Sequence, residues 1–292
     1  MPFDAKTPAL ALGCAVLTVA ALAGCGGTAA LDAKPGAKPD ATSGTANGAT
    51  SGATPPVKPV TSAPPAATRS LAGRTVVIDP GHNPGNFRHT SEINQQVDIG
   101  TNRKECDTTG TSTADGYTEA AFTLDVSHRL RDLLRAQGAT VVLTHDAERP
   151  FGPCVDERAR LGNKAKADAV VSVHADGSAA GNRGFHVILP ARVQSGAADT
   201  TAIVGRSRTL GERVAAQFAR ATGTSPANYI GSGTGLDVRE DLGGLNLSTV
   251  PKVFLECGNM RDPKDAALLA NAAWRQKAAR GIADGIGTYL QG

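Results

Sequence analysis

The stretch "VVIDPGHNPGN", residues Val76 to Asn86, places an apolar run directly before a turn. The β-branched residues at its start predict a short buried strand, and Pro80-Gly81 predicts the turn that ends it. The end of such a strand lies at the rim of an open α/β sheet, where these folds bind their ligands. His82 is therefore a candidate functional residue, although a single histidine in a loop is more often only a polar surface residue.

Outward from this strand, apolar strands and amphipathic helices alternate along the chain. A long turn-rich region separates the first strand from a helix in which Phe122, Val126, Leu130 and Leu133 form one apolar face. This alternation predicts an α/β fold: a single domain with a mainly parallel or mixed central sheet and helices on both faces. The predicted strands are 75–80, 139–146, 168–176, 184–190 and 250–259, and the predicted helices are 118–138, 155–167, about 202–221 and 274–290.

The N-terminus has the features of an export signal. Lys6 precedes an apolar segment, and "LAGCGG" follows it. A basic start, an apolar core and small residues before a cleavage point predict a signal peptide over 1–24. Residues 22–25 resemble the bacterial lipobox, which would make a lipidated Cys25 the mature N-terminus. Ordinary cleavage near Ala23 and an uncleaved anchor remain open as alternatives.

The next segment, 25–70, has almost no large apolar side chain and is rich in Ala, Thr, Gly, Ser and Pro. Because it cannot bury enough surface to offset its ordering entropy, we expect a disordered tether. The folded domain is then 71–292. With a lipid on Cys25, it would be held in the cell envelope, on the outer face of the cytoplasmic membrane; without the lipid, the protein would be secreted or periplasmic.

Composition and missing motifs exclude several functions. The formal net charge is +3 and the pI is about 8.6, with no clustered basic stripe, so a dedicated nucleic-acid binder is not expected. No glycine-rich phosphate loop follows the first strand, and there is no G-x-S-x-G serine elbow and no H-E-x-x-H zinc helix.

Three cysteines, Cys106, Cys154 and Cys257, lie in the predicted domain. Export makes a disulfide plausible. Cys106 and Cys154 both occupy turn-rich segments, whereas Cys257 follows an apolar strand, so we expect Cys106 to pair with Cys154 and Cys257 to be free. Three free thiols are the alternative. Closing this loop could stabilise the domain by about 4 kcal/mol.

Three apolar strands end in similar residues: His82, His174 and Glu256. If these strands are parallel, the three side chains emerge at the same edge of the sheet. Two imidazoles there suggest zinc, whose catalytic sites use three protein ligands, with His₂Glu as one known set. The best third ligand is Glu119, which opens the helix after the first strand. Its structural alternative is an acidic residue that stabilises the helix N-terminus.

Glu256 has the position of a general base, which takes a proton from attacking water and returns it to a leaving amine. Its structural alternative is a buried acid paired with an arginine. Among the other histidines, His145 and His186 belong to strand segments and are the main rivals as ligands. His89 and His128 are expected to be solvated.

These residues match the motif series of a known family. "VVIDPGHNPGN", the glutamate of "GYTEAAFTLDVSHRLRDLL", "VVSVHADGS" and "VPKVFLECGNM" occur in order over residues 74–290. The series resembles the zinc-dependent N-acetylmuramoyl-L-alanine amidases of the amidase-3 type, with the greatest similarity to single-domain actinobacterial peptidoglycan amidases.

The resemblance implies one Zn²⁺ held by His82, Glu119 and His174, with Glu256 as the catalytic base. It implies cleavage of the amide between N-acetylmuramic acid and L-alanine of the stem peptide, in cell-wall remodelling or turnover. It also implies a disulfide that tethers the loop after the first motif, in agreement with the pairing expected above. Arg239 and the "DLGGLN" segment, Asp241 to Asn246, fall where family members contact substrate.

Two positions depart from the family pattern: Asp176 stands where many members have asparagine, and Cys257 where they have an apolar residue. We expect a monomer that acts on peptidoglycan or muropeptides and meets the membrane only through its N-terminal lipid. A zinc carboxypeptidase or deacetylase of the envelope, and a lipoprotein that binds peptidoglycan without cutting it, remain as alternative functions.

Overall fold

The computed structural model describes residues 70–292. The predicted signal peptide, the lipidation site Cys25 and nearly all of the predicted tether lie outside the described residues. Within them, no helix combines the length and apolar character needed to cross a membrane.

A six-stranded sheet forms the centre of the domain, in the order β4-β1-β5-β10-β6-β9. The strands from β4 to β10 are mutually parallel, β6 pairs antiparallel with β10, and β9 is parallel to β6. The predicted mixed sheet is confirmed. The strands are β1 (Thr75–Pro80), β4 (Thr140–Leu143), β5 (Ala169–Asp176), β6 (His186–Pro190), β9 (Leu236–Arg239) and β10 (Lys252–Asn259).

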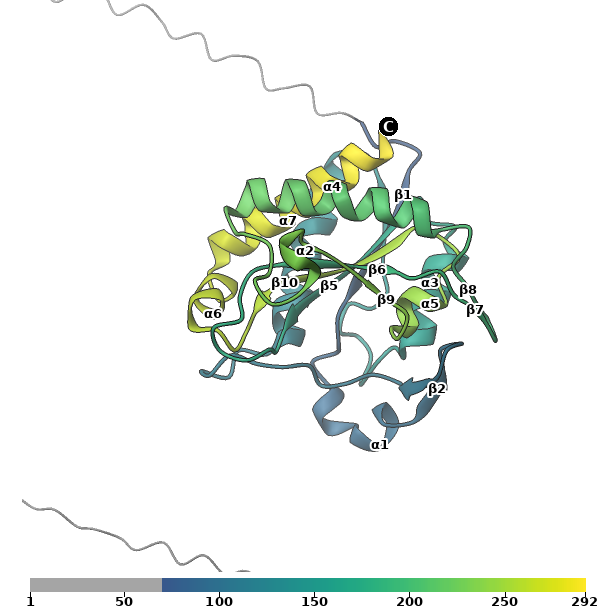
Figure 1. The fold of residues 1–292 in the computed structure, drawn as a ribbon, viewed down its shortest axis with the longest axis horizontal. Helices are drawn as coiled ribbons and strands as arrows, with labels where there is room; N and C mark the ends of the chain where they lie inside the picture. The colour runs from purple at the N-terminus through teal and green to yellow at the C-terminus, as the bar shows by residue number, and fades with distance from the viewer. Residues whose placement is uncertain (1–69) are drawn as a thin grey trace, which may run out of the picture. The chain divides into compact units, whose positions relative to one another are not determined.

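Helices cover both faces of this sheet, as predicted, but unequally. On one face α4 (Val204–Thr222) and α7 (Ala272–Leu290) lie side by side, with α2 (Glu119–Ala136) beside α7 (Figure 1). Their apolar side chains and those of the strands form one large core. On the other face, α3 (Val155–Lys164) and the short α5 (Gly243–Asn246) cover only a small apolar cluster around Val77 and Val170.

Successive side chains along the central strands point to opposite faces, as strand geometry requires. In β5 and β10 the odd-numbered residues, such as Val173 and Leu255, belong to the large core. The even-numbered residues point to the thinly covered face, which we call the polar face. In β1 the odd-numbered residues Val77 and Asp79 point to this face. In register across the three central strands, Asp79 lies beside Ser172 and Ser172 beside Phe254, and His174 lies beside Glu256.

The predicted irregular region between β1 and α2 contains short elements of its own. Cys106, just after β3, is bonded to Cys154, just before α3, and the backbone N–H of Val155 donates to the carbonyl of Cys106 at 2.8 Å. The region is therefore fastened to the domain next to the β1 turn. Its elements are a 3₁₀ turn (Asn86–Arg88), α1 (Thr90–Ile93), β2 (Gln96–Asp98) and β3 (Arg103–Glu105).

Several short elements were not predicted. The edge strand β9 lies in the glycine-rich region after α4, where its four residues are too few to give a pattern. Helix α6 (Pro263–Leu269) did carry a signal, because Asp262 caps it and proline occupies its first position. The hairpin strands β7 (Gln194–Ser195) and β8 (Ala198–Asp199) and the short helix α5 also gave no pattern.

Candidate metal centre and active site

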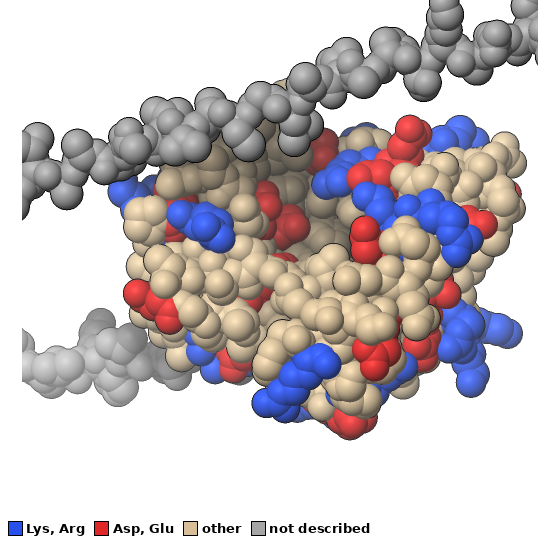
Figure 2. Space-filling view, turned by 90° about the horizontal axis from the view of Figure 1, so that it is seen from below, with Lys and Arg blue, Asp and Glu red and all other residues tan. Residues whose placement is uncertain are grey.

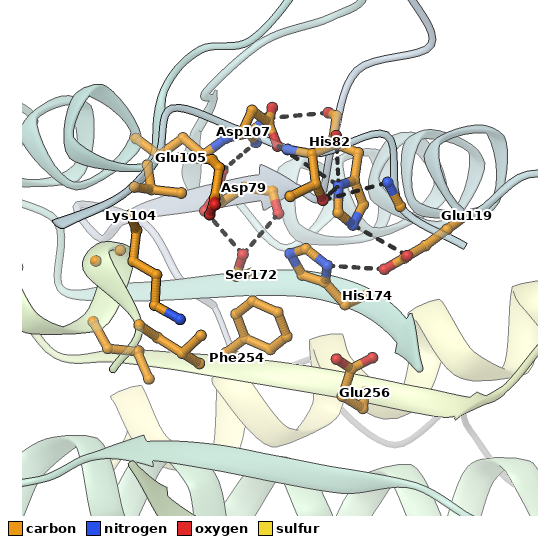
Figure 3. A pocket seen from close by; sticks show the side chains of 18 of the residues that line it. Asp79, His82, Lys104, Glu105, Asp107, Glu119, Ser172, His174, Phe254 and Glu256 are labelled. Carbon is orange, nitrogen blue, oxygen red and sulfur yellow. Dashed lines mark hydrogen bonds and ion pairs between the residues drawn. The ribbon is translucent and has the colours of Figure 1, made fainter. Parts of the chain in front are cut away.

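His174 and Glu256 lie side by side at the carboxyl ends of neighbouring parallel strands. They are register partners in β5 and β10, and both point to the polar face. The ring of His174 stacks on Phe254, with ring centroids 3.8 Å apart. The strand pattern alone thus brings a ligand-type residue beside a carboxylate that is far away in sequence (Figure 3).

The turn after β1 brings His82 to the same place. His82 has φ of 61°, a left-handed conformation that is uncommon outside glycine and is often found at functional sites. Gly81 is required beside it, because a Cβ there would lie 2.2 Å from the ring of His174. The turn therefore folds back closely enough for the two imidazoles to meet edge to face, with centroids 5.0 Å apart.

Glu119 joins the two histidines from the first turn of α2, where Thr118 is the N-cap. Its Oε1 lies 2.9 Å from Nδ1 of His174, and its Oε2 lies 3.1 Å from Nε2 of His82. The backbone N–H groups of Thr111 and Ala175 also donate to this carboxylate, at 3.0 and 3.2 Å. The carboxylate is held from several sides and does more than stabilise a helix N-terminus.

The donor set fits a zinc ion. One ligand atom from each of His82, Glu119 and His174 lies within 4.8 Å of the others, in the His₂Glu combination found at catalytic zinc sites. Nδ1 of His82 is 3.0 Å from the carbonyl oxygen of Thr108, to which it donates, so neutral His82 presents the lone pair of Nε2 to Glu119. Two acceptors face each other there, an arrangement that needs a proton or a cation between them.

The close packing of the three ligand residues shifts their pKa values. Burial alone would lower the pKa of His82, but Glu119 and Asp107 outweigh burial and raise this pKa to about 10. The pKa of Glu119 is held well below its usual range, because the histidines outweigh its own burial. Burial lowers the pKa of His174. Without metal, a proton on His82 thus supplies the positive charge that the carboxylate demands.

Glu256 completes the arrangement from the other side of His174. Its Oε2 is inaccessible to solvent and has no hydrogen-bond partner. Burial, then the carboxylates of Glu119 and Asp176, raise its pKa well above the usual range. No arginine is within ion-pair distance of it, so the alternative of a paired buried acid does not hold among the described residues. Glu256 also lines the cavity that contains the metal-ligand group.

This cavity, of about 350 Å³, contains all four residues and we call it the metal-site cavity. It opens on the polar face of the sheet, between the loop after β3 and the start of α5. One face of the domain is hollowed, and acidic side chains lie inside the hollow (Figure 2). Seven carboxylates line the metal-site cavity: Asp79, Glu105, Asp107, Glu119, Asp176, Asp241 and Glu256.

Known proteins share both the sequence and the fold. Residues 76–288 match the model of a family, Amidase_3, described as N-acetylmuramoyl-L-alanine amidase. The chain belongs to this family. The amidase is 40% identical over 233 residues to the N-acetylmuramoyl-L-alanine amidase Rv3717 of Mycobacterium tuberculosis, a match that covers 80% of this chain and 92% of the relative.

Solved structures agree with this membership. The amidase resembles the N-acetylmuramyl-L-alanine amidase Ami1 of Mycobacterium smegmatis with a TM-score of 0.69 and 40% identity, over 76% of this chain and 99% of that one. It also resembles AmiC2 of Nostoc punctiforme, with a TM-score of 0.56 and 23% identity, over 76% of this chain and 99% of that one. The second likeness concerns the fold alone.

The rival histidines of the amidase lie outside the ligand group. His145 is buried; its Nε2 is 3.0 Å from the carbonyl oxygen of Pro80, and its Nδ1 accepts from the N–H of Ala147. His186 is buried against Tyr229. His128 pairs with Asp146, and His89 pairs with Glu92 at 3.2 Å.

The residues expected to contact substrate differ in whether they line the metal-site cavity. Asp241 lines the metal-site cavity, and Arg239 grips its carboxylate with two hydrogen bonds of 2.8 and 2.7 Å. Asn246 is fully buried and does not line the cavity; its amide donates to the carbonyls of Ile99 and Glu240. Asn246 therefore connects the segment around Ile99 to the segment around Glu240 and does not face the substrate cavity.

The two positions that depart from the family pattern also differ from each other. Asp176 lines the metal-site cavity and accepts a hydrogen bond of 2.5 Å from the hydroxyl of Tyr229. Cys257 points to the opposite face and is buried in the large core, where burial raises its pKa. Only Asp176 is positioned to meet a substrate.

A buried ionic network under the site was missed by the sequence reasoning. Asp79 accepts from Lys252 at 3.0 Å and from Arg158 at 2.9 Å, and Arg158 also donates to Asp107 at 2.8 Å. Asp107 lies 3.6 Å from Nδ1 of His82, so the network reaches the ligand group. Lys252 within the apolar run "VPKVFLE" was the available signal, because a lysine in a buried strand needs a partner.

Proposed function

We propose that this amidase hydrolyses the amide between the lactyl group of N-acetylmuramic acid and L-alanine of the stem peptide, with a zinc ion held by His82, Glu119 and His174. One observation carries the proposal: three ligand atoms from three separate elements meet beside the unpartnered carboxylate oxygen of Glu256. Family membership supports peptidoglycan as the substrate.

A zinc ion held there would polarise the scissile carbonyl and make water more acidic. Glu256 accepts the proton of the attacking water on its carboxylate, as the new C–O bond forms. It then transfers this proton to the alanine nitrogen while the C–N bond breaks. The products are the lactyl carboxylic acid on the sugar and a stem peptide with a free L-alanine amine.

The surrounding residues hold the machinery in place. Thr108 fixes the tautomer and ring orientation of His82 through its carbonyl, and Asp107 adds a carboxylate on the same side. Glu256 must be ionised to act as base, and positive charge in the ligand group favours that form against the burial that otherwise protonates it. Asp241, held by Arg239, offers a carboxylate to the substrate in the same cavity.

The test joins metal analysis of the purified full chain to digestion of peptidoglycan before and after chelation. We expect one zinc per chain and release of stem peptides with free L-alanine N-termini, abolished by the chelator and restored by zinc. Release of acetate or of a terminal amino acid instead would indicate a deacetylase or carboxypeptidase. A folded, metal-free chain that binds the wall without cutting it would contradict the proposal.

We also propose that the chain works as a lipid-anchored monomer in the cell envelope. The lipobox at residues 22–25 supports the lipid anchor, and the 46 residues of the segment 25–70 would let the domain reach the wall above the membrane. Metabolic labelling with a fatty-acid analogue should mark the wild-type chain and not Cys25→Ala. Equal labelling of both chains, or of neither, would contradict lipidation at this cysteine.

A further inference from the structure

A second cavity, of about 410 Å³, lies next to the metal-site cavity. Gly110 lines both cavities, and its backbone packs against the ligand group: a Cβ there would lie 2.8 Å from Oε2 of Glu119 and from the ring of His82. The second cavity is also lined by Asn83, directly after His82, and by Thr118 and Ala120, on either side of Glu119. A substrate with its reacting bond at the ligand group therefore has room for one arm in each cavity.

The two cavities differ in charge. The metal-site cavity is lined by seven carboxylates and three basic side chains, Lys104, Arg158 and Lys252, whereas the second cavity has no acidic residue and one charged residue, Arg261. We call it the Arg261 cavity. The rest of its lining is neutral and offers hydroxyl groups and one exposed aromatic ring: Thr109, Thr111, Ser112, Thr118 and Phe87.

Arg261 is held in place by its backbone while its side chain remains available. It follows β10, at the same end of the sheet as Glu256, and its N–H donates to Oδ1 of Asn259 at 2.9 Å. Asn259 is fully buried and its amide donates to the carbonyls of Ser178, Ala179 and Asn182. No carboxylate of the described residues forms an ion pair with the guanidinium of Arg261.

We propose that the Arg261 cavity is the subsite for the stem peptide, in which Arg261 binds a peptide carboxylate and Phe87 packs against its apolar side chains. This subsite rests on the proposed function and assigns the peptide part of the substrate to the Arg261 cavity. A stem peptide carries carboxylates along its length, and the excess of carboxylates over basic side chains makes the metal-site cavity the less favourable place for them. A guanidinium without a protein partner attracts them and matches a carboxylate in shape.

The test compares two muramyl tetrapeptides, one with free peptide carboxylates and one with all of them converted to carboxamides. We expect wild type to show a kcat/KM about tenfold higher on the acid. Arg261→Ala should lose that factor on the acid and keep the wild-type value on the amide, with Arg261→Lys between the two. Phe87→Ala should weaken both substrates equally, and Arg280→Ala, which removes an exposed arginine of α7, should change neither.

Two results would overturn the subsite. One is an Arg261→Ala enzyme that still prefers the acid, and the other is an equal loss on both substrates. If Arg261→Ala unfolds, Arg261→Gln provides the same comparison. If wild type cuts neither substrate, the proposed function fails, and the subsite is then tested by calorimetric titration of the two free tetrapeptides into wild type and Arg261→Gln. Tighter binding of the acid by wild type, lost in Arg261→Gln, would support the subsite. Equal binding of the two tetrapeptides by wild type would reject the subsite.

Discussion

The two faces of the central sheet are built from the same strands and serve different ends. On the face under α2, α4 and α7, β5 and β10 contribute apolar side chains such as Val173 and Leu255 to the large core. On the polar face, the alternate residues of those strands include Ser172, His174 and Glu256. A period of two lets one strand contribute both to stability and to chemistry.

The largest effect is expected on the polar face, from Glu256→Gln. The amide has the size of the carboxylate and cannot accept a proton, so kcat should fall by about 10³-fold while zinc content and thermal unfolding stay near wild type. Enzyme kinetics and metal analysis would measure this. His174→Ala is the matched variant on the neighbouring strand and should lose both zinc and activity. Loss of zinc in Glu256→Gln would mean that Glu256 is a ligand instead of the base.

Arg158→Met tests the ionic network of the polar face. Removing the guanidinium leaves Asp79 and Asp107 buried with too little positive charge, so the free energy of unfolding should fall by about 3–5 kcal/mol. Urea unfolding would measure the change. Arg160→Met is the matched control, because Arg160 lies on the same helix, is well exposed and pairs only with Glu157. Similar losses of unfolding free energy in the two variants would show that the buried network contributes no more to stability than an exposed ion pair.

Leu130→Ala tests the apolar face. Leu130 is fully buried in α2, and its truncation should lower the free energy of unfolding by about 2–5 kcal/mol through lost burial and a residual cavity. The kcat/KM of the folded enzyme should stay close to wild type, because only apolar contacts on the far side of the sheet change. A large fall in kcat/KM at a temperature where the variant is folded would show that the two faces are coupled.

The smallest expected effect is the loss of stability at acidic pH that comes from Asp79. Burial alone would raise the pKa of Asp79, but Lys252 and Arg158 outweigh burial and hold this pKa far below its usual range. The stability gained from the ionised carboxylate is therefore present above the unfolded-state pKa, near 4, and is lost as the pH falls below it, at about 1.4 kcal/mol for each pH unit. Urea unfolding between pH 5 and pH 3 should show a flatter pH dependence for Asp79→Asn, whereas Leu130→Ala should parallel wild type. Parallel curves for Asp79→Asn would remove Asp79 from this account.

Much of the fold was predictable because its strands and helices are long and regular. The alternation of apolar strands and helices correctly predicted a mixed sheet covered on both faces. Short elements such as β9 escaped, since four residues give no pattern of their own and are held by pairing with β6. The turn-rich positions of Cys106 and Cys154 favoured the disulfide that the structure contains.

The amino-acid order alone specifies which residue types stand at the strand ends, and so which chemistry the chain could support. His82, His174 and Glu256 each follow or end an apolar run that predicts a buried strand, and Glu119 opens an amphipathic helix. Which of these side chains meet depends on the folded domain, because strand register sets His174 beside Glu256 and the close approach at Gly81 brings in His82. Tertiary structure also placed Asn246 in the interior and joined Lys252, Asp79 and Arg158 under the site. Contacts between residues far apart in sequence have no local pattern, since they arise from strand pairing and from the need of every buried charge for a partner.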